Sequence, residues 1–220
     1  MTIALEKPIA LTTMFQKADA TWNDYIVLRE TETDDWRKIS FYNGHLWADM
    51  GTEGPGHSGF SDLMTIIFGF WAYLHPDTVF QSYGRCLIDL PETHACAPDL
   101  VLYKGDDIPK WKSGEPRRID LKRHRVPDLV GEIADTSLSL DLDEQKRLYA
   151  SLGISEYWVI DVKGARLFAF GLMESGEYEP IAVSQILEGL PIDLLEQTLE
   201  RLSEQTNTAA ASWFMKKLTT

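Results

Sequence analysis

Two acidic residues lie inside apolar, β-prone segments of the sequence. Asp99 follows Pro98 in ACAPDLVLY, and Glu132 lies in PDLVGEIAD beside Ile133. Burying a carboxylate in a strand is costly without a partner, and a second acid together with a cation would supply that partner. Carboxylate and carbonyl oxygens are ligands that Mg²⁺ and Mn²⁺ prefer. We therefore predict that Asp99 and Glu132 bind Mg²⁺ or Mn²⁺, with the backbone carbonyl of Ile133 as a further ligand.

A lysine follows these acids in the next expected helix. The stretch SLDLDEQKRLYASLG has acidic residues near its start, leucines at helical spacing and a terminating Gly153, so it predicts a helix that carries Lys146. From that helix Lys146 could reach a metal-bound water or a phosphate. There it would stabilise the charge that develops when water attacks in line.

His57 and Glu53 lie just before or at the start of another expected helix, HSGFSDLMTIIFGFWAYL, which is apolar nearly all round. Either side chain could bind the metal or a water molecule. A cap or loop contact at the helix N-terminus explains both residues equally well. The sequence leaves these two interpretations open.

A basic segment joins the two acidic strands. KWKSGEPRRIDLKRHR, residues 110–125, holds seven basic and two acidic residues and so carries a net charge of +5 in a chain of −13. Such an overall charge argues against a broad non-specific grip on nucleic acid, which needs many cationic contacts to phosphate. A local contact between this loop and a DNA backbone remains possible. Its candidate residues are Lys110, Lys112, Arg117, Arg118, Lys122, Arg123 and Arg125.

Each candidate also has an ordinary structural interpretation. Asp99 could be a strand-end residue, and Glu132 could pair with an arginine of the basic segment. Lys146 could pair with Asp143 or Glu144 on the surface of its own helix. The basic segment itself could be a solvated loop.

The expected elements form an α/β protein with a mixed sheet. LTTMFQKADA, residues 11–20, predicts a short helix, and residues 37–50 predict a hairpin that turns at Asn43-Gly44. Further strands are expected in residues 78–103, 127–135 and 156–172, and PIDLLEQTLERLSEQ predicts a C-terminal amphipathic helix. Ser58 or Ser61 is expected to cap the apolar helix.

Length and composition limit the architecture. The chain has 220 residues, 44% of them hydrophobic, which is typical of one globular domain. We expect a single domain over residues 1–220, with a core at about 37–172 and C-terminal helices at about 191–218. The sequence has no basic start followed by an apolar run and no stretch long enough for a membrane span. A cytoplasmic protein is therefore expected.

The order of these segments resembles the PD-(D/E)XK nuclease superfamily, and more closely the Uma-type restriction endonuclease family of bacteria. The resemblance rests on Pro98-Asp99, on Glu132, on a K-x-x-Y pattern at Lys146 and Tyr149, and on GISEYWVID, residues 153–161. It covers roughly residues 41–172. The resemblance implies a restriction endonuclease-like fold, with a mixed sheet flanked by helices, an N-terminal β-hairpin and a C-terminal helical appendage.

One position departs from the superfamily pattern. The superfamily has a lysine two residues after the second acid, where this chain has Ala134. Similar families are interpreted as carrying the lysine on the following helix. The resemblance therefore implies that Lys146 takes that role.

Two functions of different classes follow. The first is a metal-dependent endonuclease that hydrolyses phosphodiester bonds in DNA, with Asp99, Glu132 and Lys146 as its catalytic residues. The second is a catalytically silent nuclease-fold protein that acts as a binding or assembly module. In that case apolar residues on the outer face of residues 191–205, with Trp213, Phe214 and Met215, would form a homodimer surface.

Overall fold

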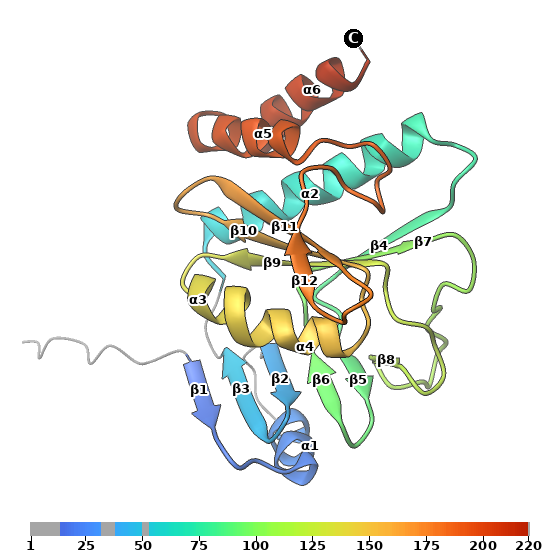
Figure 1. Cartoon of the computed structure of the whole chain (residues 1–220), viewed down its shortest axis with the longest axis vertical. Coiled ribbons are helices and arrows are strands. Elements are labelled where there is room, and N and C mark those ends of the chain that lie inside the picture. The colour runs from blue at the N-terminus through green and yellow to red at the C-terminus, as the bar shows by residue number, and fades with distance from the viewer. Residues whose placement is uncertain (1–13, 32–37, 50–52, 220) are drawn as a thin grey trace, which may run out of the picture.

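The computed structural model describes residues 14–31, 38–49 and 53–219. Within these ranges the strands form two six-stranded mixed sheets (Figure 1). Sheet A has the order β1-β3-β2-β6-β5-β8, and sheet B has the order β12-β11-β10-β9-β7-β4. The α/β class and the mixed sheet expected from the sequence are confirmed.

The bounds of the elements follow chain order. The strands are β1 (Met14–Lys17), β2 (Lys38–Tyr42), β3 (His45–Asp49), β4 (Phe80–Gly84), β5 (Ile88–Leu90), β6 (His94–Cys96), β7 (Leu100–Lys104), β8 (Ile119–Asp120), β9 (Leu129–Ala134), β10 (Glu156–Asp161), β11 (Arg166–Leu172) and β12 (Tyr178–Pro180). The helices are α1 (Trp22–Glu30), α2 (Pro55–Leu74), α3 (Leu138–Leu140), the π-helical turn η1 (Asp141–Gln145), α4 (Lys146–Ser151), α5 (Ile192–Glu204) and α6 (Asn207–Leu218).

The hydrophobic clusters show how these elements are layered. One cluster joins α2, α5 and α6 to one face of sheet B. A second joins the other face of sheet B to α4 and to residues of sheet A such as Trp47 and Ile88. A third packs α1 against sheet A. The α3–α4 segment consequently lies between the two sheets, as Figure 1 shows.

Alternation along two adjacent strands explains why both acidic residues face the same layer. Strands β7 and β9 are antiparallel, with Leu100 opposite Gly131 and Val101 opposite Val130. Continuing this register by one residue sets Asp99 opposite Glu132. Because side chains alternate between the faces of a sheet, both carboxylates share the face of Val101 and Val130, which packs toward α4.

The β2–β3 hairpin forms as the Asn43-Gly44 dipeptide predicts. Asn43 has φ 48° and Gly44 has φ 76°, the pair of positive values that a type I′ turn requires. The register pairs Tyr42 with His45 and Lys38 with Asp49. The hairpin thereby holds Lys38 at the end of β2. Arg37 and Met50, which the sequence analysis included in the hairpin, lie outside the described residues.

Two expectations about elements are corrected. The predicted helix at residues 11–20 is wrong in its described part, because Met14–Lys17 is a strand that pairs with β3. The first helix starts instead after Thr21, where Thr21 and Asp24 form a capping box. Helix α2 begins after Gly54 with Pro55 in its first turn, so neither Ser58 nor Ser61 is its cap. The C-terminal helical appendage expected from the sequence is present as α5 and α6.

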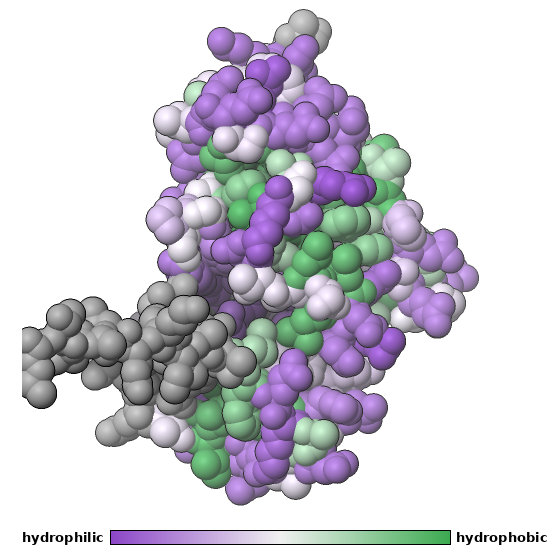
Figure 2. Space-filling view, turned by 90° about the vertical axis from the view of Figure 1, so that its left-hand side faces the viewer, coloured by the Kyte–Doolittle hydropathy of each residue, from purple (hydrophilic) through white to green (hydrophobic). Residues whose placement is uncertain are grey.

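The face shown in Figure 2 is largely hydrophilic. On the face shown in Figure 2, hydrophilic residues dominate the two ends of the molecule, and hydrophobic residues gather across its middle. None of the described helices is both long and apolar enough to cross a membrane.

Candidate metal centre

Asp99 is a buried acceptor on which three donors converge. Its Oδ2 lies 2.9 Å from Lys38 Nζ, 2.8 Å from the backbone nitrogen of Ile133 and 3.3 Å from His57 Nε2. Burial alone would raise the pKa of this carboxyl group. Lys38, His57 and the Ile133 amide outweigh that effect and hold the pKa of Asp99 well below its usual range. Asp99 is therefore an anion in the folded protein.

Glu132 lies deeper, with no exposed surface. Its Oε1 accepts a hydrogen bond from Tyr149 Oη, and its Oε2 accepts one from Lys38 Nζ. Burial raises the pKa of Glu132 well above its usual value, and the negative charge of Asp99 raises it further, while Lys38 opposes both. The alternative interpretation, in which Glu132 pairs with an arginine of the basic segment, is wrong, because Lys38 makes the ion pair.

Lys38 is the cation that joins the two acids. Burial would lower the pKa of its ammonium group, but the charges of Asp99, Glu132 and Asp141 raise the pKa above its usual value. The ammonium group therefore stays charged at neutral pH. Sequence analysis missed this residue, because Lys38 lies about sixty residues before Asp99 and no local pattern in RKISFY links it to either acid.

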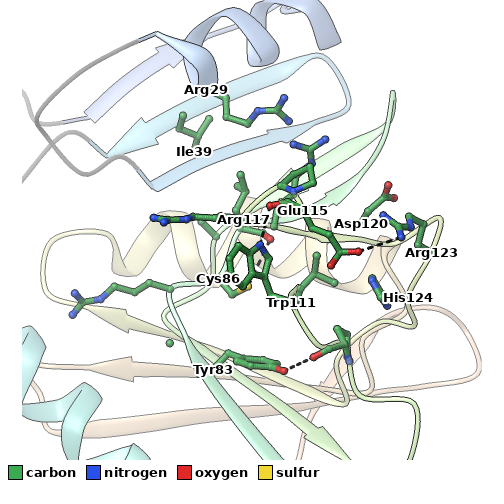
Figure 3. A pocket seen from close by; sticks show the side chains of 18 of the residues that line it. Arg29, Ile39, Tyr83, Cys86, Trp111, Glu115, Arg117, Asp120, Arg123 and His124 are labelled. Carbon is green, nitrogen blue, oxygen red and sulfur yellow. Dashed lines mark hydrogen bonds and ion pairs between the residues drawn. The ribbon is translucent and has the colours of Figure 1, made fainter. Parts of the chain in front are cut away.

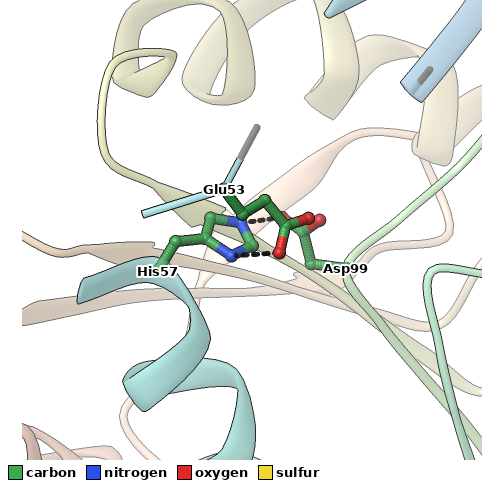
Figure 4. A group of neighbouring side chains, drawn as sticks. All are labelled: Glu53, His57 and Asp99. Carbon is green, nitrogen blue, oxygen red and sulfur yellow. Dashed lines mark ion pairs between the residues drawn. The ribbon is translucent and has the colours of Figure 1, made fainter. Parts of the chain in front are cut away.

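A second group of ligand types adjoins Asp99. Glu53, His57 and Asp99 each offer a ligand atom, and these atoms lie within 4.8 Å of one another (Figure 4). His57 Nδ1 lies 3.1 Å from Glu53 Oε2, and Arg85 also forms an ion pair with Glu53. His57, in the first turn of α2, and Glu53, just before that helix, thus both lie close to Asp99. These are the two residues for which the sequence left a metal-binding role and a helix-capping role open.

A cavity of about 210 Å³ adjoins Glu53, His57 and Asp99. Asp99, Lys38 and Ile133 line it, and the α3–η1 segment contributes Asp141 and Gln145. Gln145 Oε1 is buried and has no hydrogen-bond partner among the described residues. Several oxygen acceptors, one of them unsatisfied, suit a hard divalent cation that keeps some of its water. The donor set therefore fits Mg²⁺ or Mn²⁺.

Asp141 is a further acid that sequence analysis did not select. Its side chain accepts a hydrogen bond of 2.6 Å from Ser137 Oγ. Burial raises the pKa of Asp141 to about 6, while Lys38 opposes this effect. The sequence showed Asp141 only as one of several acids in a first helical turn. The π-helical turn η1, which buries Asp141, has no signature in the residue pattern.

Lys146 does not join this cluster. Its Nζ lies 3.8 Å from the centroid of the Phe170 ring, and neither Asp99 nor Glu132 is among its contacts in the described structure. Tyr149, the other residue of the K-x-x-Y pattern, reaches Glu132 instead. The structure thus brings together Asp99, Glu132 and His57 from the predicted set and leaves Lys146 outside, while the backbone carbonyl of Ile133 stays a predicted ligand.

The basic residues of segment 110–125 lie in different environments. Lys110, Arg117, Arg118 and Arg123 line a second cavity, whereas Lys112 and Lys122 do not. Arg125 is engaged by the protein itself, because it pairs with Asp128 at 2.8 Å and donates to the carbonyl oxygens of Asp106 and Lys104. The seven predicted nucleic-acid contacts are therefore not equivalent.

Comparison with protein families now adds to this geometry. The family model described as "Uma2: Putative restriction endonuclease" matches residues 22–205. The chain belongs to this family. The resemblance stated from the sequence is confirmed, and membership of the Uma2 family supports a nuclease.

Among solved structures, the Uma2 chain resembles one described as "a putative nuclease belonging to DUF820 from Anabaena variabilis ATCC 29413". The identity is 16%, the alignment covers 88% of this chain and 98% of that one, and the TM-score is 0.54. At this identity the likeness establishes the fold alone. No curated protein matches the chain.

Proposed function

We propose that this protein is a divalent-metal-dependent endonuclease that hydrolyses phosphodiester bonds in DNA. The observation that carries the proposal is the pair of buried carboxylates, Asp99 and Glu132, held on one face of adjacent strands with Lys38 between them. Two carboxylates can be buried together only when a positive charge, from a metal ion or an ammonium group, lies beside them. Phosphodiester hydrolysis likewise needs positive charge near the reacting phosphate.

In this proposal Asp99 and Glu132 hold the metal, with the Ile133 carbonyl, His57 and Glu53 as candidates for its remaining positions. A bound Mg²⁺ or Mn²⁺ would lower the pKa of a coordinated water and neutralise charge on the phosphate. The hydrogen bond from the Ile133 amide fixes the Asp99 carboxylate, and Tyr149 fixes Glu132.

Lys38 takes the role that the resemblance gave to Lys146. Its ammonium group lines the cavity beside Asp99 and stays protonated, so it stabilises negative charge that develops on the phosphate. During hydrolysis the water oxygen bonds to phosphorus as the bond from phosphorus to the leaving oxygen breaks. Lys38 supplies charge on this path, while the lysine on α4 does not reach it.

A plasmid-nicking assay tests this function. Wild type, Asp99→Asn and Glu132→Gln would be incubated with supercoiled DNA in Mg²⁺ or Mn²⁺ at low salt, with EDTA as the metal-free control. We expect nicking by wild type only when metal is present, and a loss of at least ~100-fold in both variants. Equal nicking by wild type and Glu132→Gln would overturn the proposal.

The same assay separates the second function. A protein that binds Mn²⁺ but nicks no DNA would be a binding or assembly module, as the sequence analysis left open. Phe214, which that function placed on a homodimer surface, packs inside the protein's own core instead.

A further inference from the structure

A second and larger cavity lies beside the metal centre. Its volume is about 970 Å³, close to the upper end for small-molecule sites in proteins. The loop that joins β7 to β9 supplies much of its lining, and α1 and the β4–β5 connection supply other parts. Figure 3 shows these side chains around the cavity. Nothing in the proposed hydrolysis uses it.

An exposed aromatic ring is fixed in this cavity. Trp111 is 57% exposed, yet its Nε1 donates a 2.8 Å hydrogen bond to the carbonyl oxygen of Glu115. The backbone nitrogen of Lys112 donates to the Glu115 carboxylate, and the backbone nitrogen of Glu115 donates to the Lys112 carbonyl. The turn therefore holds the large apolar surface of the Trp111 ring in solvent, although burial of an indole ring is energetically favourable. A flat, preorganised ring of this kind suits stacking with a planar ligand.

The charge around the ring is positive. Six basic residues line the cavity and three acidic residues oppose them. The basic residues are Arg29, Arg85, Lys110, Arg117, Arg118 and Arg123. This balance differs from that of the whole chain, which carries −13.

Four of these cations are already paired. The buried Asp89 pairs with Arg29 at 2.8 Å and with Arg118 at 3.1 Å, while Arg123 and Arg85 pair with glutamates. Lys110 and Arg117 form no ion pair with another described residue, and both are exposed. Two cations are thus available to an anionic ligand next to the Trp111 ring.

Neighbouring residues of β2 line the cavity and the metal centre. Ile39 lines the cavity, and its neighbour Lys38 lines the metal centre. Consecutive side chains of a strand point to opposite faces, so Ile39 and Lys38 face the two sites from opposite sides of β2. Arg85 lines the cavity and reaches Glu53 of the metal centre, and its backbone nitrogen donates to the carbonyl of Asp99.

From these observations we propose that the cavity binds one nucleotide of an unpaired nucleic acid strand, with its base stacked on Trp111 and its phosphate contacted by Lys110 and Arg117. A nucleotide combines a planar ring with an anion, which is the combination that the cavity offers. The inference rests on the proposed nuclease function for the nature of the strand. The nucleotide in the cavity would then lie on the same strand as the phosphate at the metal centre.

Binding without cleavage tests this inference. Fluorescence anisotropy of a labelled oligothymidylate of about ten nucleotides would be followed in EDTA at several salt concentrations. We expect Trp111→Ala to weaken binding by about tenfold or more, and Trp111→Phe to retain most of the affinity, because stacking needs an aromatic face. Trp111 is half exposed and its replacement leaves the core intact.

The cationic part has a matched pair of variants. Lys110→Ala and Arg117→Ala are expected to weaken binding severalfold and to lessen its salt dependence, because each removes a phosphate contact. Lys112→Ala removes the same charge from the same loop but from outside the cavity, so its effect is expected to be smaller. Equal losses of affinity in Lys110→Ala and Lys112→Ala would mean that the loop binds through non-specific electrostatic attraction, and would overturn the proposal that the cavity is the binding site.

Competition by thymidine 5′-monophosphate distinguishes the two sources of a nucleotide. Displacement of the oligonucleotide at micromolar concentration would make a free nucleotide the ligand and overturn the proposal of a strand, whereas no displacement would support a strand. Wild-type affinity in Trp111→Ala, or no oligonucleotide binding by wild type, would overturn the inference.

Glu132→Gln separates this inference from the proposed function. If that variant loses nicking but binds the oligonucleotide as wild type does, both stand. If wild type never nicks DNA but its binding depends on Trp111, the nuclease proposal fails alone and the cavity remains a nucleotide site.

Discussion

At the scale of single residues, the site depends on a balance between burial and charge. Asp99 and Glu132 are almost fully buried, and the charge that compensates them comes from Lys38. A buried ion pair contributes little net stability, but removal of one partner leaves an uncompensated charge and is costly. Lys146, which the sequence indicated, and Lys38, which the structure indicates, can therefore be distinguished by the stability and activity of their variants.

Replacement of Lys38 should have much larger consequences than replacement of Lys146. Lys38→Ala is expected to lower the free energy of unfolding by ~3–5 kcal/mol in EDTA and to lower the nicking rate by at least ~100-fold. Lys146→Ala removes only the contact with Phe170, worth ~0.5–1 kcal/mol, and should keep the nicking rate. Urea unfolding and plasmid nicking measure both effects.

Metal provides the control for Lys38→Ala. Saturating Mg²⁺ should stabilise this variant more than it stabilises wild type, because the dication replaces the missing positive charge between the carboxylates. A variant that remains folded in Mg²⁺ and nicks at the wild-type rate would contradict the role of Lys38. Loss of nicking in Lys146→Ala with nicking kept in Lys38→Ala would show that Lys146, and not Lys38, is the catalytic lysine.

Asp141 should give the protein a pH-dependent loss of stability. Its pKa is raised from 3.8 to about 6, so between these values the folded state holds a proton that the unfolded state has released. Stability from this group is present below pH 3.8 and is lost as pH rises to about 6, by up to ~3 kcal/mol. Asp141→Asn cannot ionise, so the stability difference between wild type and variant in EDTA should shift by that amount over this range. A difference independent of pH would refute the assignment.

At the scale of elements, local patterns predicted more than distant contacts did. Asn43-Gly44 predicted the β2–β3 hairpin, and the apolar runs around Asp99 and Glu132 predicted strands at those acids, which the structure pairs as β7 and β9. The sequence could not reveal that β2 brings Lys38 to those acids, since that contact spans two sheets and depends on how the sheets pack. The helix predicted at residues 11–20 failed for a related reason, because pairing with β3 overrode a weak local preference.

The hairpin turn gives a test at this scale. Gly44→Ala should lower the free energy of unfolding by about 1 kcal/mol, because φ is 76° there and a side chain strains that conformation. Gly69→Ala is the matched control in helix α2, where nothing lies within 4 Å of the added carbon and φ is helical. It should raise stability by up to ~1 kcal/mol. Equal effects in thermal unfolding would contradict the turn assignment.

At the scale of the whole molecule, the C-terminal helices belong to the main core. Phe214 has no exposed surface and packs in the cluster that joins α2, α5 and α6 to sheet B. Sequence analysis counted Phe214 among residues of a homodimer surface, and its burial inside the chain removes it from that role. A homodimer and a single domain over residues 1–220 both stay predictions.

Truncation of Phe214 tests this integration. Phe214→Ala should lower the free energy of unfolding by ~3–5 kcal/mol, in one cooperative transition if the chain is a single domain. Ser212→Ala changes an exposed position of the same helix and should have an effect within about 0.5 kcal/mol. Circular dichroism during urea unfolding reports both. Two separate transitions, with only one of them shifted, would show that the appendage folds apart from the rest.

Anomalous scattering from crystals soaked in Mn²⁺ locates the metal. We expect an anomalous peak within about 2.3 Å of an Asp99 carboxylate oxygen, with the Lys38 ammonium moved away from the line between Asp99 and Glu132. The peak should vanish in Asp99→Asn. No peak at Asp99, or an equal peak in Asp99→Asn, would contradict a metal centre at this pair of strands.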